Sequence, residues 1–107
     1  IGALDVKNSA VGTYGSHIFK EIEREWQMGN YKYQSLISPG QITLYFVVNK
    51  KGQVFRQRQV EMRGASGIQW GIVLNSVTSA KIPPMSKDVI KELGGEDLEL
   101  TMGFTYN

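Results

Sequence analysis

The stretch from Gln41 to Met62 constrains this chain most, because it has the pattern of a β-hairpin. Side chains alternate between the two faces of a strand, so apolar residues at every second position share one face. Four such residues occur in the first half, namely Ile42, Leu44, Phe46 and Val48. We expect that face to be buried. Asn49 to Gly52 supply turn residues, and Gly52 can take the positive φ that a tight turn needs.

The first strand of this hairpin is expected to be central and the second to be an edge. The remaining positions of the first strand, Thr43, Tyr45 and Val47, are also β-branched or aromatic, which favours a neighbouring strand on each side. The return strand from Val54 to Met62 is more polar. Its segment Arg56 to Gln59 is typical of an edge, where charge discourages pairing with another sheet.

Length and composition limit the classes of protein to consider. With 107 residues and 41% hydrophobic content, the chain suits one domain with one core. A formal net charge of +2 is too small to indicate a nucleic-acid or anionic-lipid partner. The absence of cysteine excludes disulfides and thiol catalysis. Because the chain opens on Ile1 rather than Met, we expect it to be part of a longer protein.

Two helices are expected around the hairpin. Residues 1–15 are rich in small residues and lack periodicity, which predicts a linker or flexible N-terminal segment, with the folded domain over 16–107. Ser16 is the expected N-cap of a helix that runs to about Met28 and stops at Gly29 and Asn30. The apolar side of this helix comprises Ile18, Phe19, Ile22 and Trp26.

The second helix is expected from Gly67 to about Ala80. Ser66 and Gln69 have the spacing of a capping box, in which each side chain satisfies a backbone N–H at the helix start. We expect a close packing contact at Gly71, because a glycine otherwise weakens a helix. The apolar stripe that should cover the sheet comprises Ile68, Ile72, Val73, Val77 and Ala80. A short helical turn over Ser86 to Leu93 is also expected.

The last strand has the most regular alternation in the chain. Apolar residues occupy every second position from Leu98 to Tyr106, and polar residues or glycine lie between them. The element order is therefore α-β-β-α-β, and a right-handed crossover places the last strand beside the first. The predicted fold class is α+β, with a three-stranded antiparallel sheet of order 2-1-3 and two helices packed on one face.

The sequence contains few residues that could form a catalytic site. His17 is the only histidine, and the motifs of a nucleophile elbow, a zinc protease or a phosphate-binding loop are missing. His17 and Glu21 could both reach a metal from one helix face, but a third ligand is lacking. We therefore expect no enzyme activity, no metal and no cofactor. Gly64 to Gly67 matches the KH-domain G-x-x-G loop only formally, because it joins a strand to a helix.

With its elements laid out, the chain from about Ile18 to Tyr106 resembles the C-terminal domain of the TonB/TolA family. The resemblance rests on a helix ending near Trp26, an alternating strand closed by a turn at Gly52, and the Ser66-Gly67 step before a helix. Its most specific part is the Ile82-Pro83-Pro84 exit followed by the strand from Leu98 to Tyr106. The domain is expected to begin with a helix and lacks the Tyr-Pro start that is typical of TonB itself. Both features favour the TolA-like branch of the family.

This resemblance implies a periplasmic domain, anchored to the inner membrane by an upstream segment and coupled there to a motor complex. Such domains are not enzymes, and they grip an outer-membrane receptor or an outer-membrane-associated periplasmic protein. The expected contact is strand addition at an open sheet edge. The predicted partner-binding residues are Glu99, Leu100, Thr101, Met102, Gly103, Phe104 and Thr105.

Two alternatives to this function stay open. The first is a self-associating structural module, in which the edge pairs with a second copy to give a homodimer. The second, less favoured, is a small nucleic-acid-binding domain that uses Phe55, Arg56, Arg58 and Arg63.

Overall fold

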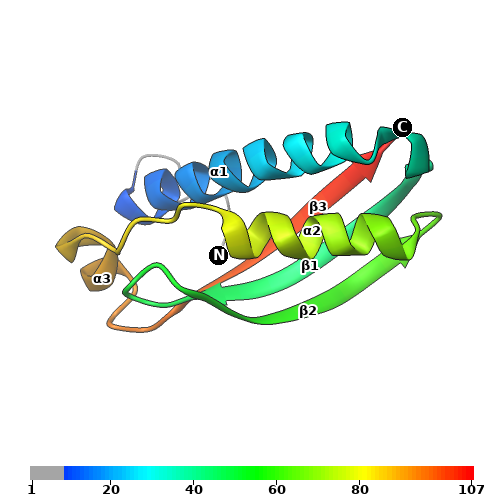
Figure 1. The fold of residues 1–107 in the computed structure, drawn as a ribbon. Helices are drawn as coiled ribbons and strands as arrows, with labels where there is room; N and C mark the ends of the chain where they lie inside the picture. The colour runs from blue at the N-terminus through cyan, green and yellow to red at the C-terminus, as the bar shows by residue number, and fades with distance from the viewer. Residues whose placement is uncertain (1–8) are drawn as a thin grey trace.

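A three-stranded antiparallel sheet of order β2-β1-β3 carries the fold, as predicted. The computed structural model describes residues 9–107, in which α1 and α2 lie side by side over one face of the sheet (Figure 1). The α+β class and the order of the main elements are confirmed. The elements are α1 (Ala10–Lys32), the 3₁₀ turn η1 (Gln34–Leu36), β1 (Gly40–Val48), β2 (Val54–Arg63), α2 (Gly67–Ser79), α3 (Lys87–Glu92) and β3 (Leu98–Tyr106).

The core lies between β1 and the two long helices. Ile42, Leu44, Phe46 and Val48 are all 0% exposed, which confirms the buried face predicted for the first hairpin strand. Helix α1 contributes Ile18 and Ile22 to this core, and α2 contributes Val73 and Val77.

Helix α1 is longer than predicted at both ends. It begins at Ala10 with Ser9 as its N-cap, so the predicted cap at Ser16 is wrong and residues 10–15 are helical rather than linker. The remaining part of the predicted linker, residues 1–8, lies outside the described residues. At the other end α1 continues through Gly29 and Asn30 to Lys32.

A distant carboxylate explains the early start of α1. Oε1 of Glu92, in α3, accepts from the Ala10 backbone N–H at 2.9 Å, and its Oε2 accepts from Val11 at 3.0 Å. The Ser9 hydroxyl accepts from the Gly12 N–H at 2.9 Å. These acceptors satisfy N–H groups of the first turn, which have no partner inside a helix.

Helix α2 begins as predicted, with the Ser66–Gln69 capping box formed. Two details of its packing differ from expectation. Ile68, assigned to the stripe over the sheet, is 43% exposed, and no heavy atom lies within 4 Å of a Cβ added at Gly71. The close contact is at Gly29 instead, where an added Cβ would lie 2.8 Å from Cγ2 of Ile72. The glycine that lets the two helices approach is therefore in α1.

The hairpin turn and the segment after α2 hold one end of the domain together. Gly52 has φ 80°, as predicted for the turn, and an added Cβ there would meet the Ile82 carbonyl oxygen at 2.5 Å. The Met85 N–H donates to the Lys50 carbonyl at 2.9 Å. Helix α3 follows with Ser86 as its N-cap, which confirms the predicted helical turn.

Candidate functional site

The outer edge of β3 is a long and regular strand edge. All nine residues of β3 pair with β1 without a register shift, from Leu98 opposite Val48 to Tyr106 opposite Gly40. Within residues 9–107 β3 has β1 as its single neighbour, so its other edge is unpaired. Such an edge presents a row of backbone N–H and C=O groups to an extended chain.

The predicted partner-binding residues divide between the two faces of this strand. On the outer face lie the exposed residues Glu99, Thr101, Gly103 and Thr105. On the helix-covered face Phe104 is 1% exposed, whereas Leu100 and Met102 are only partly buried. An added strand could therefore cover apolar surface at Leu100 and Met102 as well as pair with the backbone.

An aromatic cluster fixes the C-terminal end of β3 to α1. The Trp26 ring lies 5.6 Å from that of Phe104 and 5.2 Å from that of Tyr106, the latter in an edge-on arrangement. Trp26 Nε1 donates to the Tyr106 hydroxyl at 2.7 Å, and that hydroxyl donates to Asn30 Oδ1 at 2.8 Å. Burial raises the pKa of Tyr106.

Side-chain bonds across the outer face brace β3 against β1. Thr105 Oγ1 donates to Gln41 Oε1 at 2.5 Å, and the Tyr45 hydroxyl donates to Glu99 Oε1 at 2.5 Å. The hydrogen bond to Glu99 raises the pKa of Tyr45. A Cβ added at Gly103 would lie 3.0 Å from Gln41 Nε2, so the amide of Gln41 borders the space that this glycine leaves. No bulge occurs at Gly103.

The opposite edge of the sheet, β2, is irregular. From Ile42 to Val48 seven residues of β1 face the nine residues of β2 from Val54 to Met62, so β2 carries two extra residues. The register shifts fall opposite Thr43/Leu44 and Tyr45/Val47, and Arg56, at the second shift, has φ 55°. Bulges of this kind bend a strand and disrupt its ladder of backbone groups.

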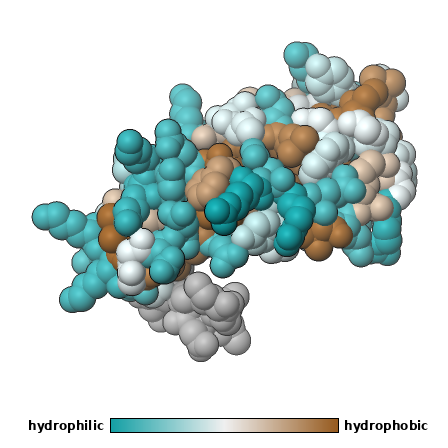
Figure 2. Space-filling model, turned by 90° about the horizontal axis from the view of Figure 1, so that it is seen from below, coloured by the Kyte–Doolittle hydropathy of each residue, from teal (hydrophilic) through white to brown (hydrophobic). Residues whose placement is uncertain are grey.

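Arginines add bulk and charge to β2. The Arg58 guanidinium lies 4.7 Å from the centre of the Tyr45 ring, and that of Arg56 lies 5.5 Å from the Phe55 ring. Strand β2 lies lowest in Figure 1, and Figure 2, which views the molecule from below, shows hydrophilic side chains over much of that side. Both features discourage an incoming strand at β2, so the two sheet edges are not equivalent.

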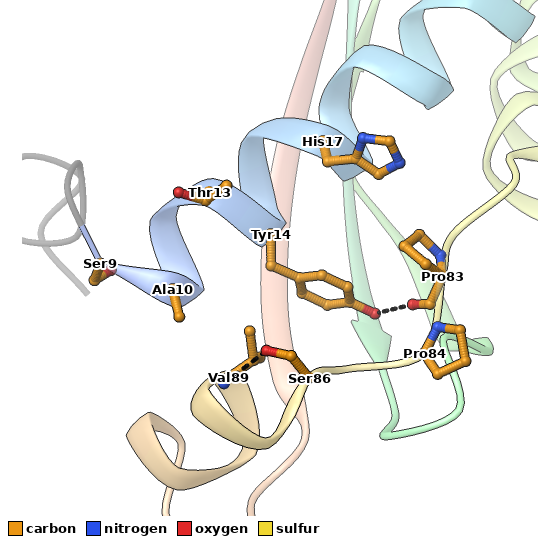
Figure 3. Close-up of a pocket in the computed structure, with 9 residues that line it drawn as sticks. All are labelled: Ser9, Ala10, Thr13, Tyr14, His17, Pro83, Pro84, Ser86 and Val89. Carbon is orange, nitrogen blue, oxygen red and sulfur yellow. Dashed lines mark hydrogen bonds between the residues drawn. The ribbon is translucent and has the colours of Figure 1, made fainter.

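His17 lies at a surface hollow of about 530 Å³ between the start of α1 and the Pro83-Pro84 segment. Figure 3 shows Tyr14 reaching from α1 to this segment, where its hydroxyl donates to the Pro83 carbonyl at 2.7 Å. Burial raises the pKa of Tyr14. Tyr14 thus fastens α1 to the segment that leads into α3.

Neither a metal site nor a membrane-spanning helix is found in the described part of the chain. Residues 9–107 bring together no group of three His, Cys, Asp or Glu side chains able to hold a metal ion. None of the helices in that range has the length and apolarity that a bilayer crossing requires.

Comparison with known proteins adds one finding about the fold. No protein-family model and no curated protein matches the chain. Among solved structures, the chain is similar to the solution structure of the TonB C-terminal domain of Helicobacter pylori, with a TM-score of 0.54 and 17% sequence identity. The similarity covers 83% of this chain and 78% of that domain. The fold is therefore TonB-like, and the comparison gives no support to the TolA-like branch.

Proposed function

We propose that this domain is the partner-gripping end of an energy transducer of the bacterial cell envelope. It binds an extended segment of an outer-membrane receptor, or of a periplasmic protein associated with the outer membrane, as a fourth strand beside β3. The observation that carries this proposal is the contrast between a regular β3 edge and an irregular, arginine-bearing β2 edge. Strand addition uses backbone hydrogen bonds for affinity and side-chain contacts for specificity.

The TonB-like fold and the sequence resemblance supply the cellular context of this proposal. Under it, the domain works in the periplasm, an upstream segment anchors the protein in the inner membrane, and a motor complex there supplies the force. The function is mechanical and requires neither catalysis nor a cofactor.

The geometry of the β3 edge suits a domain that has to transmit a pull. Hydrogen bonds between antiparallel strands lie perpendicular to the strands. A pull along an added strand is therefore resisted by many backbone hydrogen bonds at the same time, because it acts at right angles to each of them. The cluster of Trp26 with Phe104 and Tyr106 ties the same strand to α1, so the load can pass from the edge into the helix layer.

Proline scanning along β3 tests the proposal. Proline lacks the backbone N–H and would remove one edge donor wherever that N–H points outward. Because neighbouring amides of a strand point to opposite sides, Thr101→Pro and Met102→Pro should be compared, and one of them should spare the bonds to β1. Losing one backbone hydrogen bond should weaken binding about 2- to 12-fold. Thr101→Ala, which keeps the N–H, is the matched control and should bind like the wild type.

The probes are peptides that correspond to extended periplasmic segments of outer-membrane receptors. Calorimetry gives the affinity, circular dichroism checks that each variant is folded, and amide NMR shows which strand responds. We expect shifts concentrated in Glu99 to Thr105. Shifts confined to β2, or unchanged affinity in every folded proline variant, would refute the assignment to β3.

The same titrations distinguish the alternatives that the sequence leaves open. Arg58→Ala should not change peptide affinity if β3 is the binding edge. A homodimer formed by edge pairing would shift the same β3 amides as protein concentration rises, without any peptide.

A further inference from the structure

A groove lies between α1 and α2 on the helix layer. It has a volume of about 600 Å³. On the α1 side it is lined by Glu25, Met28, Gly29 and Lys32, whose spacing places them on one face of the helix. We call this hollow the helix groove. It shares no residue with β3, so it is separate from the proposed partner-binding edge.

Two glycines explain why the surface is hollow here. At Gly29 the absent side chain lets Ile72 of α2 approach closely, and this contact forms the floor. At Gly71, on the α2 wall, the space that a side chain would fill is open. The walls beside these glycines are apolar and accessible, since Met28 is 55% exposed and Ile68 is 43% exposed. A projecting side chain therefore lies next to a hollow that could receive one.

The charges at the two ends of the α1 stripe are opposite. Glu25 and Lys32 are seven residues apart, which is about two helical turns or about 10 Å. Within residues 9–107 neither of them forms an ion pair. The Lys32 ammonium lies 5.4 Å from the centre of the Tyr33 ring. Met28 and Gly29 occupy the midpoint between the two charges.

This stripe is complementary to itself when two copies run antiparallel. A two-fold axis near Met28 would place Glu25 of each α1 opposite Lys32 of the other, giving two opposite-charge contacts. A parallel arrangement would instead place like charges together. Two-fold contacts of this kind use the same patch on both subunits, so a self-complementary patch is what they require.

We propose that the helix groove is the interface of a homodimer, in which α1 of each copy lies antiparallel in the groove of the other. Met28 of each copy enters the open space at Gly71 of its partner. The β3 edges stay outside this contact, so the dimer presents two edges. This inference does not depend on the proposed function of β3.

Charge exchange tests the arrangement directly. Analytical ultracentrifugation at low ionic strength should be run on the wild type, Glu25→Lys, Lys32→Glu and the double variant. Each single variant creates like-charge contacts and should raise the dimer dissociation constant at least about tenfold. The double variant restores both opposite-charge pairs and should return to within about threefold of the wild type. Lys20→Glu, an equal charge change on α1 outside the groove, should have no such effect.

Filling the hollow gives a second test that does not rely on charge. No heavy atom lies within 4 Å of a Cβ added at Gly71, so Gly71→Leu should fold while blocking entry of Met28. It should therefore be monomeric, whereas Thr78→Leu, on α2 outside the groove, should dimerise like the wild type. Circular dichroism melts confirm that both variants are folded.

Three results would overturn the proposal. The first is a wild-type chain that remains monomeric up to about 1 mM, a concentration at which even weak specific association is visible. The second is a double variant no better than the single ones. The third is a dimer that survives Gly71→Leu but is lost on proline substitution in β3, because that dimer would form through the strand edge.

Discussion

The same substitution at two glycines should have clearly different effects on stability. Gly29 and Gly71 are both helical, and each can be replaced by alanine with a gain in helix propensity. At Gly71 the added methyl meets no heavy atom within 4 Å, whereas at Gly29 it would lie 2.8 Å from Cγ2 of Ile72. Ile72 is 5% exposed and β-branched, so its methyl has little freedom to move away.

The size of each effect follows from two opposing terms. Replacing glycine by alanine inside a helix raises the free energy of unfolding by about 0.5–1 kcal/mol. We expect that gain in full for Gly71→Ala. At Gly29 the methyl also overpacks the contact between α1 and α2, which costs about 1–3 kcal/mol. Gly29→Ala should therefore be neutral to about 2.5 kcal/mol destabilising, and the two variants should differ by about 1–3 kcal/mol.

Urea denaturation at low protein concentration measures both free energies of unfolding. In a thermal melt each 1 kcal/mol should shift the midpoint by about 4–8 °C for a domain of this size. Combining Gly29→Ala with Ile72→Ala removes the clashing methyl, so in that background the alanine at position 29 should no longer destabilise. Equal effects of Gly29→Ala and Gly71→Ala, or a Gly29→Ala cost that persists without Ile72, would refute the assignment of the close contact.

Two further predictions concern the core and the start of α1. Phe46→Ala should lower the free energy of unfolding by about 3–5 kcal/mol, because a fully buried ring leaves a cavity; a urea titration showing less than about 1 kcal/mol would contradict its central place in the core. The N–H groups of Val11 and then Ala10 hold the pKa of Glu92 below its usual range, so the folded state binds this proton more weakly than the unfolded chain does. That contribution to stability is present above the unfolded pKa and is lost as pH falls from about 5 to about 3. The Glu92→Gln variant should therefore lose less stability than the wild type over this pH range. Equal losses in the two proteins would show that Glu92 does not cause the acid destabilisation.

The elements defined by short-range patterns could be predicted from the sequence. The buried face of β1 depends on a period of two over Ile42 to Val48, and the start of α2 depends on side chains three residues apart at Ser66 and Gln69. Both signals are local, so they need no knowledge of the tertiary structure. The regular alternation of β3 belongs to the same class.

The boundaries of α1 could not be predicted in this way, because distant residues set them. Its first turn has two bonds to Glu92, which is more than 80 residues away in sequence, and nothing near Ala10 indicates that partner. Its last turn contains Gly29 and Asn30, which normally end helices. Here Gly29 packs on Ile72 and Asn30 accepts from Tyr106, so tertiary contacts extend the helix past residues of low propensity.

The packing at Gly29 and Gly71 could not be predicted from local sequence patterns either. A glycine within an apolar helical pattern indicates either a close contact or an open surface, and the sequence does not distinguish these. Gly71 was expected to make a close contact and is open, whereas Gly29 was expected to end a helix and makes the close contact. The difference depends on how α1 crosses α2, which no local pattern encodes.

The candidate site depends on a property that only the pairing of strands reveals. Strand β3 was predicted to be an edge from the element order, because a right-handed crossover places it beside β1. That argument does not compare the two edges of the sheet. Which edge suits an added strand depends on both, and β1 pairs with nine residues of β3 in continuous register. The same strand pairs with β2 only through two register shifts. Because β1 is common to both pairings, the irregularity belongs to β2, and an extended partner would find an uninterrupted row of backbone groups at β3 alone.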